Sequence, residues 1–179
     1  MFESTNITKD KEIFPVEINA QLVRFDDVEY VMATARDITD RKKAEKEIQE
    51  NERQFRTLVG NIPGVVYRCL MDENWTMLFI SDEIEVLSGY PASEVLGENP
   101  PRSFSSIMHP DDIETTVQST ISALEEQHPY AHDYRVIDKE GAIHWVLAKG
   151  QGISDDNNKL LYLDGTIFDI TEQKMKQQN

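Results

Sequence analysis

Asp37-Ile38-Thr39 closes one apolar run and opens a charged segment, and Asp169-Ile170-Thr171 does the same near the C-terminus. The residues before the two phrases also match at the same spacing: Tyr30-Val31-Met32-Ala33-Thr34 precedes the first, and Tyr162-Leu163-Asp164-Gly165-Thr166 precedes the second. A repeat in which a strand ends and a charged helix begins predicts two copies of one module, joined by a helix.

Each phrase also predicts a defined junction between strand and helix. Thr39 and Thr171 are good helix N-cap residues, and Asp37 and Asp169 can accept hydrogen bonds that fix the angle between strand and helix. We therefore take Asp37, Thr39, Asp169 and Thr171 as candidate signal-coupling residues. The alternative is that they cap the two helices and have no signalling role.

Residues 1–38 are predicted to form the end of a domain whose beginning is missing. Apolar and polar residues alternate between Ile13 and Arg24, which is typical of a half-buried strand. Asp26-Asp27 predicts a turn, and Tyr30–Ile38 a second strand of an antiparallel hairpin. Because an isolated hairpin is marginally stable in water, we expect this one to dock on a neighbour, or to be swapped between two copies of the chain.

Residues 39–60 are predicted to form an amphipathic linker helix. Its apolar positions recur in alternating steps of four and three, a heptad seam whose intervening residues are charged or polar. The seam consists of Ala44, Ile48, Asn51, Phe55, Leu58 and Ile62. This pattern favours a homodimer through a two-chain coiled coil. Two alternatives stay open: the helix lies on its own domain, or Phe55 and Leu58 leave the seam and pack on the following domain.

Residues 61–171 are predicted to form one complete α+β domain, and residues 172–179 the start of an output helix. Helices grouped between strands of an antiparallel sheet indicate a sheet with one covered face. The expected strands are Val65–Leu70, Trp75–Ser81, Tyr134–Ile137, Ile143–Lys149 and Leu160–Ile170, and the expected helices are Asp82–Ser88, Pro91–Leu96 and His109–Gln127. The apolar face of the last helix should carry Ile113, Val117, Ile121 and Leu124.

The composition excludes several kinds of partner. The formal net charge of −15 over 179 residues argues against nucleic acid and anionic membrane surfaces, which would repel the chain. No apolar run approaches the roughly 20 residues that a membrane helix needs, so we expect no direct membrane insertion of this segment. The single cysteine, Cys69, fits a small core residue in a reducing, cytoplasmic setting.

The sequence lacks the motifs of common enzymes. It has no phosphate-binding glycine loop, no nucleophile elbow and no metalloprotease helix. We therefore expect the segment itself to catalyse nothing, although a longer parent protein can carry a kinase or cyclase.

Several phrases resemble, in their order and spacing, the PAS sensory domain family of bacterial and archaeal signalling proteins. They are Phe55-Arg56-Thr57-Leu58, Val66-Tyr67-Arg68, Ser88-Gly89-Tyr90, Val95-Leu96-Gly97, His109-Pro110-Asp111-Asp112, Tyr134-Arg135, Gly141 through His144-Trp145-Val146, and Gly165-Thr166 through Asp169-Ile170-Thr171. The resemblance covers residues 55–174 as a complete domain, and residues 9–42 resemble the last two strands of a preceding one.

The resemblance implies a five-stranded antiparallel sheet with short helices over one face and a cavity between them. It also implies a sensory or dimerisation role inside a larger protein, often a histidine kinase or a cyclic-dinucleotide enzyme. In such proteins the Asp-Ile-Thr exit couples the sheet to a helix that runs to the next module, so we expect flanking signalling domains as partners. The alternative function is a receptor domain for a small molecule or cofactor.

We predict no cofactor. Light-sensing relatives carry an Asn-Cys-Arg-Phe phrase, but here Asn99-Pro100-Pro101-Arg102 has a proline where the thiol would be. Haem-binding relatives supply a histidine from the helical crossing. None of His109, His128, His132 and His144 has a clear axial-ligand context. We also predict no metal site, because Asp111-Asp112 and Asp155-Asp156 are explained by helix-dipole and turn preferences.

An apolar ligand remains possible between sheet and helices. The candidate cavity lining is Tyr67, Phe79, Phe104, Ile107, Val117, Ile121, Tyr134, Trp145 and Leu163. A well-packed core explains the same residues and is the favoured interpretation. Arg68 and Arg135 lie beside them and can either meet an anionic ligand or pair with surface carboxylates.

Overall fold

A computed structural model of the chain describes residues 1–177. The chain divides into two compact units, Met1–Thr57 and the residues from Leu58 onward. The segment predicted as residues 172–179 is described up to Gln177, and its last two residues lie outside the described part.

The first unit is a three-stranded antiparallel sheet followed by a helix. The strands are β1 (Phe2–Ile7), β2 (Ile13–Phe25) and β3 (Val28–Asp37), in the order β1-β2-β3, and the helix is α1 (Thr39–Gly60). Asp26 and Asp27 both have positive φ, 47° and 57°, which is the backbone of a tight two-residue hairpin turn. The Asp pair therefore makes the turn between β2 and β3 that the sequence predicted.

Strand β1 was not predicted. Its two large apolar residues, Phe2 and Ile7, point to opposite faces of the strand, so no alternation marks it. All six of its residues are exposed, and it pairs with β2 along its whole length. Only the backbone pairing with β2 reveals this strand.

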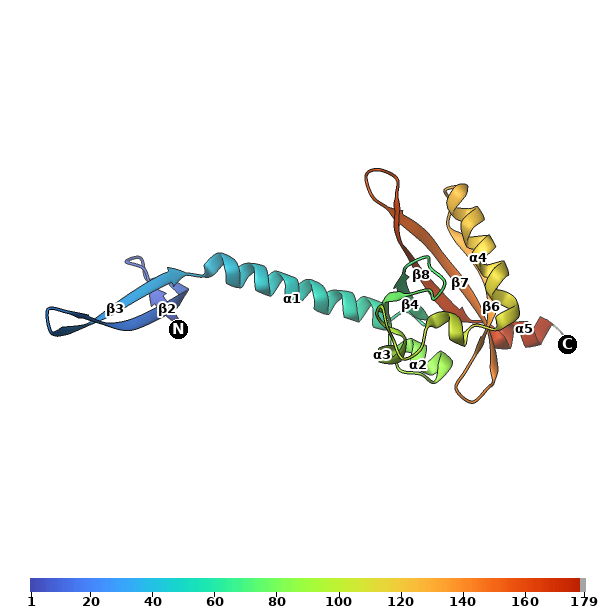
Figure 1. Cartoon of the computed structure of the whole chain (residues 1–179), viewed down its shortest axis with the longest axis horizontal. Coiled ribbons are helices and arrows are strands. Elements are labelled where there is room, and N and C mark those ends of the chain that lie inside the picture. The colour runs from blue at the N-terminus through green and yellow to red at the C-terminus, as the bar shows by residue number, and fades with distance from the viewer. Residues whose placement is uncertain (178–179) are drawn as a thin grey trace. The chain divides into compact units, whose positions relative to one another are not determined.

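The second unit contains a five-stranded antiparallel sheet in the order β5-β4-β8-β7-β6 (Figure 1). The strands are β4 (Val65–Cys69), β5 (Met77–Ile80), β6 (Tyr130–Ile137), β7 (Ile143–Ser154) and β8 (Leu160–Asp169). The helices are α2 (Glu83–Ser88), α3 (Ala92–Val95), the short 3₁₀ helix η1 (Phe104–Ile107), α4 (Pro110–Glu125) and α5 (Thr171–Gln177). This confirms the predicted α+β class with a five-stranded antiparallel sheet and short helices.

Helix α4 packs on the sheet partly through the predicted apolar face, but small residues beside that face are the most deeply buried. Its buried residues are Thr116, Thr120 and Ala123, and Ile121 is only half-buried. The Thr120 hydroxyl donates to the carbonyl of Thr116 at 2.9 Å, so a buried threonine leaves no unpaired polar group. Small side chains let the helix lie close to the sheet, and the larger Ile113, Val117 and Leu124 pack at the margin of the core.

The last three strands of the second unit repeat the arrangement of the first unit. In both, three consecutive strands form antiparallel neighbours, and the aspartate of the Asp-Ile-Thr phrase lies opposite a buried valine. Asp37 pairs with Val16 on β2, and Asp169 pairs with Val146 on β7. The second unit adds β4 on the free side of β8, where Tyr67 faces Gly165.

Candidate functional site

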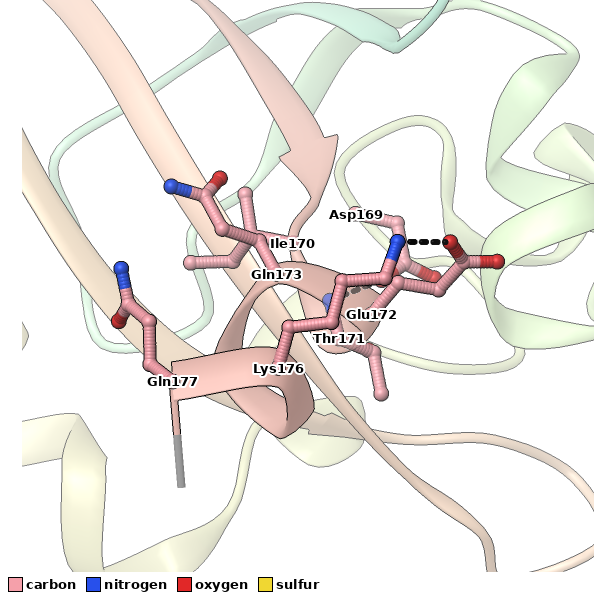
Figure 2. A pocket seen from close by; sticks show the side chains of 7 residues that line it. All are labelled: Asp169, Ile170, Thr171, Glu172, Gln173, Lys176 and Gln177. Carbon is pink, nitrogen blue, oxygen red and sulfur yellow. Dashed lines mark hydrogen bonds and ion pairs between the residues drawn. The ribbon is translucent and has the colours of Figure 1, made fainter. Parts of the chain in front are cut away.

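The junction between β8 and α5 is held by three backbone-directed hydrogen bonds. The Thr171 amide donates to Asp169 Oδ1 at 2.8 Å, a bond that lies behind the helix in Figure 2. The Trp145 amide of β7 donates to the Thr171 hydroxyl at 2.9 Å, and the Ile170 amide donates to the Trp145 carbonyl at 2.8 Å. The first turn of α5 is therefore bonded to the neighbouring strand as well as to the strand that precedes it.

The junction between β3 and α1 has the same plan with one difference. The Thr39 amide donates to Asp37 Oδ1 at 2.8 Å, and the Ile38 amide donates to the Pro15 carbonyl at 3.1 Å. Pro15 occupies the position of Trp145 but has no N–H to donate. The Thr39 hydroxyl instead donates to Asp37 Oδ1 at 2.6 Å.

The aspartates accept hydrogen bonds at the helix start as expected, whereas the threonines are not the N-cap residues that the sequence predicted. Both threonines are the first helical residue, and the first helical bonds run from Lys42 to the Ile38 carbonyl and from Lys174 to the Ile170 carbonyl. The aspartate carboxylate accepts a hydrogen bond from the first helical amide, which has no partner within the helix, so the aspartate is the capping group. The hydroxyl of Thr171 binds the neighbouring strand instead.

These hydrogen bonds stabilise the ionised form of each aspartate. The side-chain and backbone hydrogen bonds from Thr39 hold the pKa of Asp37 below its usual value. At Asp169, partial burial works to raise the pKa, but the hydrogen bonds from Thr171 and His144 outweigh it, and the pKa is lowered. Both carboxylates are therefore ionised at neutral pH, as their acceptor role requires.

An open hollow of about 690 Å³ lies along α5 and is lined by side chains from Asp169 to Gln177 (Figure 2). Lys176 pairs with Glu172 across it at 3.4 Å. The hollow is open to solvent along a helix with no buried residue, so its geometry does not indicate a small-molecule site.

The interior of the second unit is almost filled. The cavity between sheet and helices measures about 20 Å³, which is room for about one water molecule. Ligand pockets usually measure roughly 300–1,000 Å³. In this conformation the core has no room for haem, flavin or a comparable ligand.

The predicted lining residues are distributed between four places. Tyr67, Phe104 and Tyr134 line the cavity, and Ile107 and Leu163 are buried elsewhere in the core. Val117 and Ile121 are half-buried on α4. Phe79 and Trp145 do not line the cavity, because each alternates along its strand with a buried neighbour, Ile80 and Val146 respectively.

Trp145 lies instead under two cations. The Arg135 guanidinium is 5.6 Å and the Lys174 ammonium 5.0 Å from the centre of its ring. Lys174 also pairs with Asp133 of β6. Trp145 therefore connects α5 to the outer face of the sheet through its ring as well as through its backbone.

Both candidate anion-binding arginines are paired within the domain. Arg68 makes a two-pronged contact with Asp164, at 2.7 and 2.8 Å, over the ring of Tyr162. Arg135 binds Asp112 of α4 through its side chain and its backbone amide, which lowers the pKa of Asp112. Of the two alternatives, pairing with carboxylates is the one observed.

A buried tyrosine pair escaped the sequence analysis. The hydroxyls of Tyr67 and Tyr130 are 2.7 Å apart, and burial raises the pKa of Tyr67. They lie over Gly150 and Gly165, which face each other on β7 and β8. A Cβ at Gly165 would come within 2.6 Å of the Tyr67 hydroxyl, and one at Gly150 would clash with the Tyr130 hydroxyl. The sequence did contain a signal for this contact, because a glycine inside a strand often marks a place where another group approaches the backbone closely.

His132 and Cys69 also lie at this cavity. The His132 ring stacks on Tyr130 with 5.5 Å between ring centres, and burial lowers its pKa. Burial raises the pKa of Cys69 to about 12, so its thiol is unreactive near neutral pH. Within residues 1–177, no three His, Cys, Asp or Glu side chains gather where a metal ion could be held.

Two family models match the chain. The model described as PAS fold matches residues 77–167, which is half of the sequence. The chain belongs to the PAS family. A second model, described as PAS domain, matches residues 1–40. The resemblance stated from the sequence motifs is therefore confirmed.

Two curated relatives are sensor proteins much longer than this chain. The methyl sulfide methyltransferase-associated sensor of Methanosarcina acetivorans is 23% identical over 145 residues, covering 79% of this chain and 14% of the relative. The peroxide stress-activated histidine kinase mak3 of Schizosaccharomyces pombe is 27% identical over 139 residues, covering 74% of this chain and 6% of the relative. The PAS chain thus spans about a seventh or less of these relatives.

Solved structures share the fold. A PAS domain from Colwellia psychrerythraea matches with a TM-score of 0.57 and 22% identity, covering 67% of this chain and 97% of that one. A sensory box histidine kinase/response regulator from Burkholderia thailandensis matches with a TM-score of 0.55 and 22% identity, covering 70% and 90%. At this identity the likeness establishes the PAS fold.

No helix among the described residues is both long enough and apolar enough to cross a membrane.

Proposed function

We propose that this PAS chain is a non-catalytic sensory and dimerisation segment of a longer signalling protein such as a histidine kinase or a diguanylate cyclase. It passes conformational state from a sheet to the helix that follows. The observation that carries this proposal is the pair of matching junctions, in which an aspartate caps the helix and the next residue's amide bonds to the neighbouring strand. The relatives named as a sensor and a histidine kinase support the class of parent.

We assign residues 1–38 to the end of a preceding PAS domain. The match of residues 1–40 to a PAS model supports this, as does the shared register of β1-β2-β3 and β6-β7-β8. Strand β8 has β4 on its second edge, whereas the matching edge of β3 has no strand in the described part of the chain. Exposed Leu22 and Val31, which lie opposite each other on β2 and β3, fit a face that the rest of such a domain would cover.

We assign residues 39–60 to an input helix that pairs with a second copy of the chain. None of the α1 residues is buried, and Ile48 is 66% exposed. Five of the six predicted seam positions lie in α1, and Ile62 falls just beyond its end at Gly60. Their heptad spacing suits a two-chain coiled coil, in which Asn51 would lower stability and fix the register.

The charges beside the seam make this dimer weak. In a parallel pair, the residues that flank the seam bring Glu47 opposite Glu52 of the partner, and Asp40 opposite Glu45. Like charges in such positions are destabilising, although Arg56 lies 2.8 Å from Glu52 in its own helix and offsets part of this. Added salt should therefore strengthen the dimer by screening the repulsion.

Replacing Ile48 with Glu tests the dimer. The variant places a charge in the seam, and we expect it to be monomeric by sedimentation equilibrium at a concentration where the wild type is dimeric. Gln49→Glu adds the same charge at the next residue, which points away from the seam. It is the control and is expected to remain dimeric. The comparison is run at about 0.05 M and about 0.5 M salt. A wild-type dimer that Ile48→Glu leaves intact would remove α1 from the proposed interface.

The segment itself is proposed to catalyse nothing and to lie in the cytoplasm, where its free, buried Cys69 suits a reducing environment. A receptor function for a small molecule is less well supported, because the cavity of about 20 Å³ would have to open before it could hold one.

A further inference from the structure

His144 lies between two carboxylates at the base of the sheet. Its Nε2 is 3.0 Å from Asp138 Oδ2, in the turn between β6 and β7, and its Nδ1 is 3.3 Å from Asp169 Oδ2, at the end of β8. The side chain of His144 is 27% exposed and that of Asp138 17%, so this contact is partly sheltered from solvent, whereas Asp169 is 45% exposed and its contact is open to solvent.

The second oxygen of each carboxylate holds the backbone of a turn. Asp138 Oδ1 accepts from the amides of Glu140 and Ala142, at 2.9 and 2.8 Å. Asp169 Oδ1 accepts from the Thr171 amide at the start of α5. His144 therefore connects the β6–β7 turn to the junction that begins the output helix.

Both contacts require donated protons, because an ionised carboxylate only accepts hydrogen bonds. A neutral imidazole carries one N–H and can satisfy one of the two carboxylates, whereas the imidazolium carries two and can satisfy both. On loss of a proton, the longer contact, to Asp169, is the one expected to break.

No other charge is recorded against His144 in the described part of the chain. The residue opposite on β6 is the apolar Val136. Arg135 of β6 is bound to Asp112, and Lys174 of α5 to Asp133. Glu172 of α5 is paired with Lys176, and Lys139 of the turn lies over Gly89. Asp138 and Asp169 are thus the two charged side chains whose contacts depend on the charge of His144.

We propose that His144 is a protonation-dependent latch that fastens the start of α5 to the β6–β7 turn when charged and releases Asp169 when neutral. The proposal rests on the proposed function, because it makes the sheet-to-helix junction responsive to pH. The junction keeps its Thr171 bonds to Trp145 in either state, so the latch modulates the coupling and does not create it.

The aspartates set the acid limit of the latch. The His144 hydrogen bond, followed by the bonds from Ala142 and Glu140, lowers the pKa of Asp138, and the Asp169 pKa is also lowered. A carboxylate with a lowered folded-state pKa stabilises the fold above its unfolded pKa, and that contribution is lost as pH falls through the folded pKa. The latch therefore needs both aspartates ionised, and it opens as pH falls through their lowered folded-state pKa values.

Nuclear magnetic resonance on the full 179-residue chain tests the latch between about pH 5 and pH 8.5. We expect the Thr171 amide shift to titrate with the same midpoint as the His144 ring. At the acidic end, hydrogen exchange at the Thr171 amide should be about fivefold faster in His144→Gln than in the wild type, and the two should converge at the alkaline end. His144→Arg, a permanent cation, should abolish the pH dependence.

His128→Gln is the matched control, since His128 binds Glu126 beyond the end of α4 and should leave the Thr171 titration unchanged. A Thr171 amide that does not titrate in the wild type, or that titrates unchanged in His144→Gln, would overturn the latch. If α5 nevertheless stays ordered on the sheet at every pH, only the latch fails. If α5 is unattached at every pH, the proposed function fails with it.

Discussion

Thr39 and Thr171 show how one residue on a neighbouring strand changes the use of a shared motif. The Thr171 hydroxyl receives the Trp145 N–H, whereas Pro15 leaves the Thr39 hydroxyl without such a donor. The junction at α5 is therefore bonded to two strands through side chain and backbone. The junction at α1 relies on Asp37, the Pro15 carbonyl and ion pairs from Arg41 to Glu3 and Glu17.

Replacing Thr171 with Val keeps the shape of the side chain and removes its hydroxyl. The Trp145 amide loses its acceptor, and we expect a loss of about 1 kcal/mol in the free energy of unfolding. Urea unfolding followed by tryptophan fluorescence measures this, because Trp75 and Trp145 both lie in the second unit. Thr115→Val, at an exposed position of α4 in the same unit, should change stability by less than about 0.5 kcal/mol. Equal effects would contradict the proposed strand contact.

At the scale of elements, the sheet of the second unit is shaped by two facing glycines. Gly150 and Gly165 have no side chain on the inner face, which leaves space for the hydroxyls of Tyr67 and Tyr130. This pairing joins β4 to β6, two strands that are not neighbours in the sheet.

Gly165→Ala should therefore be costly, at about 2 kcal/mol or more, because the added methyl group meets the Tyr67 hydroxyl and the Lys149 carbonyl. Combining it with Tyr67→Phe should recover part of the loss, so the two changes should be non-additive in a double-mutant cycle. Gly60→Ala, which meets nothing within 4 Å, is the control. Strict additivity in urea unfolding would show that the hydroxyl is not the obstacle.

The elements differ in how far the sequence could predict them. Periodicity identified β2 and α1, because their apolar side chains recur at the period of a strand and of a helix. It missed β1, whose pairing depends on a partner strand, and on α4 it missed the buried threonines, which satisfy their hydroxyls inside the helix. The aspartates at the junctions were identified from their motif. His144 was not linked to them, because Asp138 and Asp169 meet only through strand register.

At the scale of the whole molecule, the PAS chain carries two junctions of one design, one leading into α1 and one into α5. A change at one junction affects a distant partner only if the two conformations differ in free energy. The filled core and the hydrogen-bonded junctions suit a domain that transmits a conformational change from its sheet to the helix that follows. The central claim is that the sheet and the helix that leaves it move as one body.

Residual dipolar couplings test this claim most directly. We expect the backbone couplings of α5 in the wild type to fit the same alignment tensor as those of β4, β7 and β8. In the Asp169→Ala/Thr171→Val double variant, which removes the carboxylate and the hydroxyl, the α5 couplings should shrink towards zero while those of the sheet persist. Wild-type α5 couplings that are already averaged, beside a well-ordered sheet, would contradict a rigid junction.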